Sequence, residues 1–99
     1  MTPVVKLLRT GEWADFQARG EFAGSADDRR DGYIHLSPQG EVAATLAKWF
    51  AGETGVMAVT VDADAFGADL RWEPARGGIL FPHLYRPLRL DEVIAAHPA

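Results

Sequence analysis

One stretch decides the predicted fold: Asp31-Gly-Tyr-Ile-His-Leu-Ser-Pro-Gln-Gly-Glu-Val-Ala-Ala-Thr-Leu-Ala-Lys-Trp-Phe50. Its Asp-Gly start is a breaker pair, and the strand formers Tyr33 to Leu36 follow directly. Ser37 can cap a helix, and Pro38 suits the first helical position because its missing N–H is not needed there. We therefore predict a strand, a sharp turn and a helix.

The helix predicted here is amphipathic. Its apolar residues recur at the spacing of one helical face, namely Val42, Leu46, Trp49 and Phe50. We expect this face, Trp49 included, to pack in the core. The start of the helix presents free N–H groups, which favour an anion.

His35 lies immediately before that turn and is the first candidate site residue. Alternation along a strand places Tyr33, His35 and Ser37 on one face, with Ile34 and Leu36 on the other. One face is thus apolar, whereas the other carries a phenol, an imidazole and a hydroxyl. Two readings stay open: a ligand site, or a buried histidine bonded to a backbone carbonyl.

The composition is that of an ordinary globular chain and limits the classes of function. The 99 residues are 47% apolar and 24% charged, carry a net charge of −4 and contain no cysteine. This length predicts a single domain over residues 1–99. The acidic charge argues against general nucleic-acid binding, and the lack of cysteine excludes thiolate catalysis. We find no signal-peptide pattern or membrane-spanning run and expect a cytoplasmic protein that binds no membrane.

Strand patterns outnumber helix patterns elsewhere in the chain. They cover Pro3–Leu8, Val56–Val61, Leu70–Trp72, Ile79–Tyr85 and Val93-Ile94. A second helix starts at Thr10, places Trp13 and Phe16 on one face and ends at Gly20.

Two further segments are expected to be irregular or peripheral. We predict a loop over Glu21–Asp31, with the charged run Asp27–Asp31 as a solvated turn. Pro82 cannot donate to a ladder, which places its strand at an edge or at a bend. Many strands and two helices, both from the first half of the chain, predict an α+β fold with a mainly antiparallel sheet.

Other candidate site residues follow the later strands. Glu73 could act as an acid or a base, and Arg76 could clamp a phosphate; the alternative is a surface ion pair between them. His83 shares a strand face with Phe81 and Tyr85, which suits either ring stacking or a sheet core.

Lys6 is a cation inside an apolar strand, and we slightly favour an outward side chain over a place in the site. The histidines lack the short spacing of metal ligands, so we predict no metal site.

Several blocks of sequence resemble the bacterial family known as domain of unknown function 952. They are Trp13, Asp31-Gly-Tyr-Ile-His-Leu-Ser37, Val61-Asp62, Trp72-Glu-Pro-Ala-Arg-Gly-Gly78 and Phe81-Pro-His-Leu-Tyr85. The likeness covers nearly the whole chain. It implies a relative but no reaction, because the family has no established activity.

The order of these blocks is more distantly similar to the RNA 2′-phosphotransferases. Those enzymes have the ADP-ribosyltransferase fold and use NAD. The resemblance implies an ADP-ribosyltransferase-like split antiparallel sheet with a nicotinamide-type pocket between its halves. By it, His35 and Ser37 would be pocket residues, and Arg76 or His83 would face the ligand. Where such enzymes usually carry a histidine on the first strand, this chain has Lys6.

Together these observations predict a polar cleft for a small anionic ligand of the nucleotide, NAD or ADP-ribose type. The predicted ligand-binding residues are Lys6, Tyr33, His35, Ser37, Arg76, His83 and Tyr85. The candidate catalytic residues are His35, Glu73 and His83. Three functions stay open: an NAD-dependent ADP-ribosyl- or phosphotransferase-like enzyme, a non-catalytic metabolite-binding module, and a structural domain.

Overall fold

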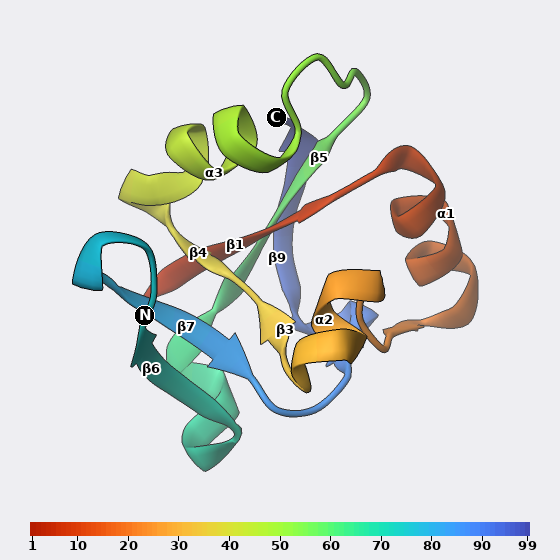
Figure 1. The fold of residues 1–99 in the computed structure, drawn as a ribbon. Helices are drawn as coiled ribbons and strands as arrows, with labels where there is room; N and C mark the ends of the chain where they lie inside the picture. Colours follow the sequence, from red (N-terminus) through yellow and green to blue (C-terminus); the bar gives the residue numbers. More distant parts are fainter.

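Two paired strands form the centre of the computed structural model, which describes residues 1–99 (Figure 1). β1 (Pro3–Leu8) and β5 (Met57–Asp62) run antiparallel, with Pro3 opposite Asp62 and Leu8 opposite Met57. β4 (Ser37–Pro38) pairs with the free side of β1, and β9 (Val93–Pro98) with that of β5. The resulting sheet has the order β4-β1-β5-β9.

A second antiparallel sheet lies beside the first and has the order β3-β7-β6. Its strands are β3 (Ile34–His35), β6 (Leu70–Pro74) and β7 (Leu80–Leu84). A short ladder joins β2 (Glu21–Phe22) to β8 (Leu88–Arg89). Only Leu36 separates β3 from β4, so the chain passes from one sheet to the other there.

Three α-helices come from the first half of the chain: α1 (Thr10–Arg19), α2 (Ala26–Asp31) and α3 (Val42–Trp49). Short 3₁₀ turns are η1 (Gln39–Glu41), η2 (Ala63–Asp69), η3 (Arg76–Gly78) and η4 (Leu90–Glu92). None of the helices is long and apolar enough to cross a membrane.

Apolar side chains cover both faces of the sheet at its central strands, β1 and β5. One face contributes Val4, Leu8, Val59 and Val61 to the main core, which also contains Phe16 of α1. The other face carries Val5, Leu7, Val56 and Ala58, on which Val42, Leu46 and Phe50 pack. Because β1 is covered on both sides, the side chain of Lys6 is buried whichever way it points.

The predicted α+β class and its antiparallel pairing are confirmed, as are the five long strands and α1. The loop predicted over Glu21–Asp31 is wrong, since α2 occupies its second half and brings the number of α-helices to three. The edge position predicted as one alternative for the strand of Pro82 is also wrong, because β7 is the central strand of its sheet. The Pro82 carbonyl accepts a hydrogen bond from the Leu36 N–H. Leu36 lies beyond the end of β3, so the β3–β7 ladder needs no donor from proline at this position.

The predicted start of the third helix is wrong as well. Ser37 and Pro38 belong to β4, and α3 begins at Val42 after a 3₁₀ turn. The Ser37 hydroxyl lies 3.1 Å from the Thr45 hydroxyl rather than on a helical N–H group. Ser37 therefore does not cap this helix.

Trp49 is 59% exposed, so the expectation that it lies in the core is wrong. Replacing it with alanine should change the free energy of unfolding by about 0.5 kcal/mol or less, as is usual at exposed positions. Urea denaturation of Trp49→Ala beside the parent measures this. A loss of about 3–5 kcal/mol, typical of a buried tryptophan, would contradict the exposed placement.

Candidate functional site

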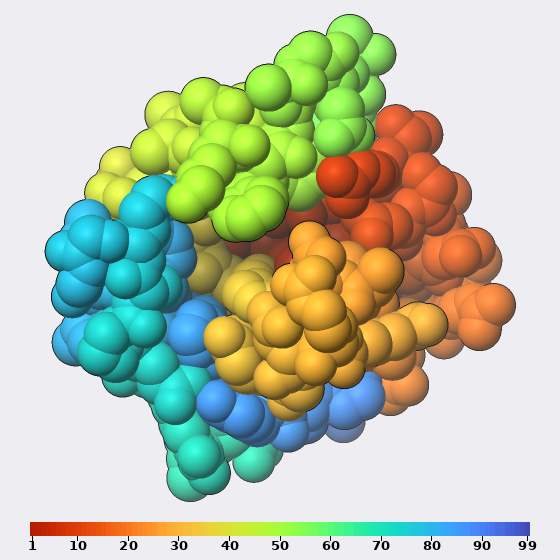
Figure 2. All heavy atoms as spheres, viewed as in Figure 1, coloured from red at the N-terminus to blue at the C-terminus, as the bar shows by residue number.

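A cavity of about 430 Å³ opens between α2, α3 and the segment that joins β6 to β7. Figure 2 shows the hollow, with α3 above it in yellow-green, α2 in orange and β1 in red at its floor. The crossing from β3 through Leu36 to Ser37 forms one wall. The cavity thus lies where the two sheets meet.

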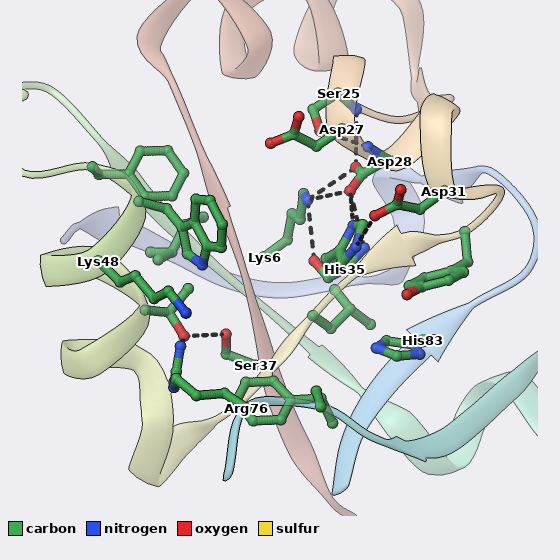
Figure 3. A pocket seen from close by; sticks show the side chains of 18 of the residues that line it. Lys6, Ser25, Asp27, Asp28, Asp31, His35, Ser37, Lys48, Arg76 and His83 are labelled. Carbon is green, nitrogen blue, oxygen red and sulfur yellow. Dashed lines mark hydrogen bonds and ion pairs between the residues drawn. The ribbon is translucent and has the colours of Figure 1, made fainter. Parts of the chain in front are cut away.

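A buried ion pair lies beside this floor (Figure 3). The Lys6 ammonium lies 2.9 Å from Asp28 Oδ2, and the two side chains are 7% and 2% exposed. Lys6 also donates to Asp28 Oδ1 and to the carbonyl of His35. The ammonium is thus engaged by the Asp28 carboxylate and by the His35 carbonyl, so Lys6 acts on the cavity through α2 and β3.

Asp28 is turned inward by the start of its own helix. Its carboxylate accepts from the Ser25 N–H while its own N–H donates to the Ser25 hydroxyl, which is a capping box. Gly24 approaches closely with φ of +120°, and a Cβ there would lie 2.9 Å from Asp28 Cβ. The turn therefore requires glycine.

The pKa of Asp28 reflects opposed effects. Burial would raise it, but hydrogen bonding from His35 and the charge of Lys6 outweigh burial. The pKa of this carboxyl is held well below its usual range. Asp28 is therefore ionised whenever the protein is folded near neutral pH.

His35 is held between two carboxylates of α2. Its Nδ1 lies 2.6 Å from Asp28 Oδ1, and its Nε2 lies 3.0 Å from Asp31 Oδ2. Its backbone N–H donates to Asp28 as well. Both ring nitrogens of His35 are thus occupied by groups of the protein.

His83 lies across the cavity from α2 and bonds to another carboxylate. Its Nδ1 lies 2.8 Å from Glu73 Oε1, which also accepts from the Tyr85 hydroxyl at 2.6 Å. The bonds from Tyr85 and from His83 lower the pKa of Glu73. Tyr33 stacks on His83 with ring centroids 4.0 Å apart, and the His35 and His83 centroids are 5.8 Å apart.

The other end of the cavity carries hydroxyls and cations. Arg76 donates from Nη2 to Glu41 and Thr45 at 3.2 and 3.3 Å, and its guanidinium packs over Phe81. Thr45 in turn contacts Ser37. Lys48 lines the same end and has no ion-pair partner. Five basic and four acidic residues line the whole cavity, so it is more positive than the chain.

Most of the residues named from the sequence come together here. Six line the cavity, namely Lys6, Tyr33, His35, Ser37, Arg76 and His83. Glu73 and Tyr85 lie behind His83 and do not line it. The alternative ion pair between Glu73 and Arg76 is not formed, because Arg76 pairs with Glu41. The alternative of an outward Lys6 is wrong too.

Sequence reasoning missed the carboxylates of α2 and the residues of α3. Asp28 had a signal in the pattern Ser25-x-x-Asp28, which is that of a capping box. Asp31 lies four residues before His35, and the two side chains meet across a glycine turn. Lys48 and Trp49 line the cavity because α3 leans over it, which no local pattern shows.

The chain is similar to solved structures of protein CC0527 from Caulobacter crescentus. Its X-ray crystal structure is 45% identical, and the match covers 98% of this chain and 85% of that chain with a TM-score of 0.95. The solution NMR structure is 46% identical over 98% and 84% of the two chains, with a TM-score of 0.87. Residues 7–96 match a family model described as "Protein of unknown function (DUF952)". No curated protein matches this chain.

Proposed function

The chain belongs to the DUF952 family, whose function is unknown, and we propose that it binds a small anionic ligand with a planar ring, of the nucleotide or ADP-ribose type. The observation that carries this proposal is convergence on one cavity. Stacked rings lie at one end, and cations and hydroxyls lie at the other. The volume of about 430 Å³ is in the range of small-molecule sites.

The cations of α3 and η3 supply the affinity for an anion. Lys48 has no ion-pair partner, so a ligand charge does not have to displace one. Arg76 contacts Glu41 and Thr45 only through Nη2, which leaves its other guanidinium donors for a phosphate or carboxylate. Its stacking on Phe81 holds the guanidinium plane.

The ring of Tyr33, which stacks on His83, supplies a flat surface for a ligand ring. The two antiparallel sheets flanking the cavity support our expectation of an ADP-ribosyltransferase-like arrangement. With that arrangement, NAD is a ligand to test. The corresponding reaction class is the transfer of an ADP-ribosyl or phosphoryl group. Binding alone would define the non-catalytic alternative.

Titration calorimetry with NAD, ADP-ribose and inorganic phosphate tests the proposal. Arg76→Ala and Lys48→Ala should each weaken binding by roughly 10- to 150-fold, because a hydrogen bond to a charged group is worth roughly 1.5–3 kcal/mol. Arg19→Ala is the matched control, since Arg19 is exposed on α1, forms no ion pair and does not line the cavity.

Two results would count against this assignment. Equal affinity in the parent, Arg76→Ala and Lys48→Ala would remove both cations from the site. If the parent protein binds none of the three probes, the result would favour the third alternative, a structural domain.

A further inference from the structure

The three histidines of this chain differ in how their ring nitrogens are engaged. Both nitrogens of His35 face carboxylates of α2, as described above. His97 is exposed near the end of β9, where its Nδ1 lies 3.1 Å from the Pro98 carbonyl. His83 is 5% exposed, and only its Nδ1 has a partner. His83 is therefore the one histidine on the cavity wall with a free ring nitrogen.

The free nitrogen of His83, Nε2, is not fully enclosed by the protein. No side-chain polar atom in the structure is both fully enclosed and without a hydrogen-bond partner. Nε2 has no partner, so it must retain accessible surface. Because His83 lines the cavity (Figure 3), a ligand bound there can meet Nε2.

The proton of the neutral His83 ring belongs on Nδ1. A carboxylate only accepts, so Nδ1 must donate to Glu73, which leaves Nε2 with its lone pair. Glu73 stays ionised near neutral pH, because the bonds from Tyr85 and His83 lower its pKa. Tyr33 covers one face of the His83 ring and limits its rotation.

We infer that His83 accepts a proton through Nε2 from a hydroxyl group of the ligand, and that Glu73 is the positioning residue that selects the neutral tautomer with its lone pair on Nε2. The inference rests on the proposed function, since the ligand supplies the hydroxyl. In this step the O–H bond breaks, its electron pair stays on oxygen, and the proton bonds to Nε2. The ring becomes an imidazolium whose Nδ1–H still faces Glu73.

The spacing along β7 narrows the ligand class. Phe81 and His83 lie on one face of the strand, two residues and therefore roughly 7 Å apart. Arg76 covers Phe81 with its guanidinium 5.1 Å from the ring centroid. A ligand that contacts both His83 and Arg76 must carry a hydroxyl and an anionic group at separate positions, as a sugar phosphate does.

Imidazole ¹⁵N NMR on the labelled protein tests the proton position at pH 8. For His83 we expect a protonated Nδ1 and an unprotonated Nε2, with a mixture of tautomers in Glu73→Gln, because an amide can both donate and accept. His97 is the internal control and should be the same in both proteins. A proton on Nε2 of the parent would overturn the inference, and an unchanged His83 in Glu73→Gln would remove Glu73 from its role.

Adding ADP-ribose tests the contact with the ligand. We expect the ¹⁵N signal of His83 Nε2 to shift with ADP-ribose, and to stay in place with inorganic phosphate, which lacks a carbon-bound hydroxyl. If calorimetry shows that ADP-ribose binds but Nε2 does not shift, the inference fails and the proposed function stands. If ADP-ribose does not bind at all, both the proposed binding of this ligand and the proton transfer from it to His83 are contradicted.

Discussion

Asp28→Ala should lower the free energy of unfolding by about 3–5 kcal/mol, the usual cost of removing one partner from a buried ion pair. The Lys6 side chain, which is 7% exposed, would then carry a buried charge without the Asp28 carboxylate as its partner. The N–H groups of Ser25 and His35 would lose their acceptor in the same substitution. Because a small domain is stable by only about 5–15 kcal/mol, this loss is severe. Urea unfolding followed by tryptophan fluorescence measures it.

The neighbouring Asp27 provides the matched control. It is on the same helix but is 63% exposed and pairs only with Arg30 at the surface. Asp27→Ala should change stability by less than about 1 kcal/mol, because exposed ion pairs contribute little. The double variant Lys6→Met, Asp28→Leu removes both charges and should be more stable than Asp28→Ala. Equal losses in Asp27→Ala and Asp28→Ala would show that the buried pair is not special.

Acid should destabilise the parent through the same carboxylate, by an amount on the order of 2–3 kcal/mol. The pKa of Asp28 is lower in the folded protein than in the unfolded chain, where it is ordinary. The unfolded state therefore takes up the proton first as the pH falls. The stabilisation is fully present above the unfolded pKa of about 4 and is lost as the pH falls below it.

Unfolding free energies at pH 7, 5, 4, 3 and 2.5 measure this dependence. Other carboxyl groups with lowered pKa values, such as Asp62 and Glu92, contribute to the same acid loss. The double variant Lys6→Met, Asp28→Leu keeps these groups, so the difference between its profile and that of the parent isolates Asp28. Parallel profiles would mean that Asp28 titrates alike in the folded and unfolded states.

The strands were predictable from the sequence because each depends on its own alternation. The run Val4 to Leu8 and the run Met57 to Val61 are apolar enough to lie in a sheet covered on both faces. The face that carries Tyr33, His35 and Ser37 followed from the same period of two. Convergence of His35 and His83 was expected from strands returning to one core, and the two rings do meet.

The predictions that failed concern residues whose contacts depend on partners distant in the chain. Asp28 reads as one charge in a charged run, and its partner Lys6 lies 22 positions away. Only the packing of α2 over β1 brings the two together. For α3 the apolar face is centred on Leu46, and Trp49 lies about 60° from it on a helix of 100° per residue. Periodicity thus places Trp49 at the border of the apolar face. It cannot show that this border faces a cavity rather than the sheet.

The buried position of Lys6 has a consequence for chemical labelling. The chain contains only two lysines, Lys6 and Lys48. The Lys6 amine is enclosed, donates two hydrogen bonds and forms an ion pair with Asp28, whereas Lys48 is exposed at the edge of the cavity. Besides the N-terminal amine, an acylating reagent therefore has one reactive lysine in the folded protein. Because acylation removes the Lys48 charge, the labelled protein should bind an anion more weakly, as Lys48→Ala should, and labelling tests this cation without any substitution.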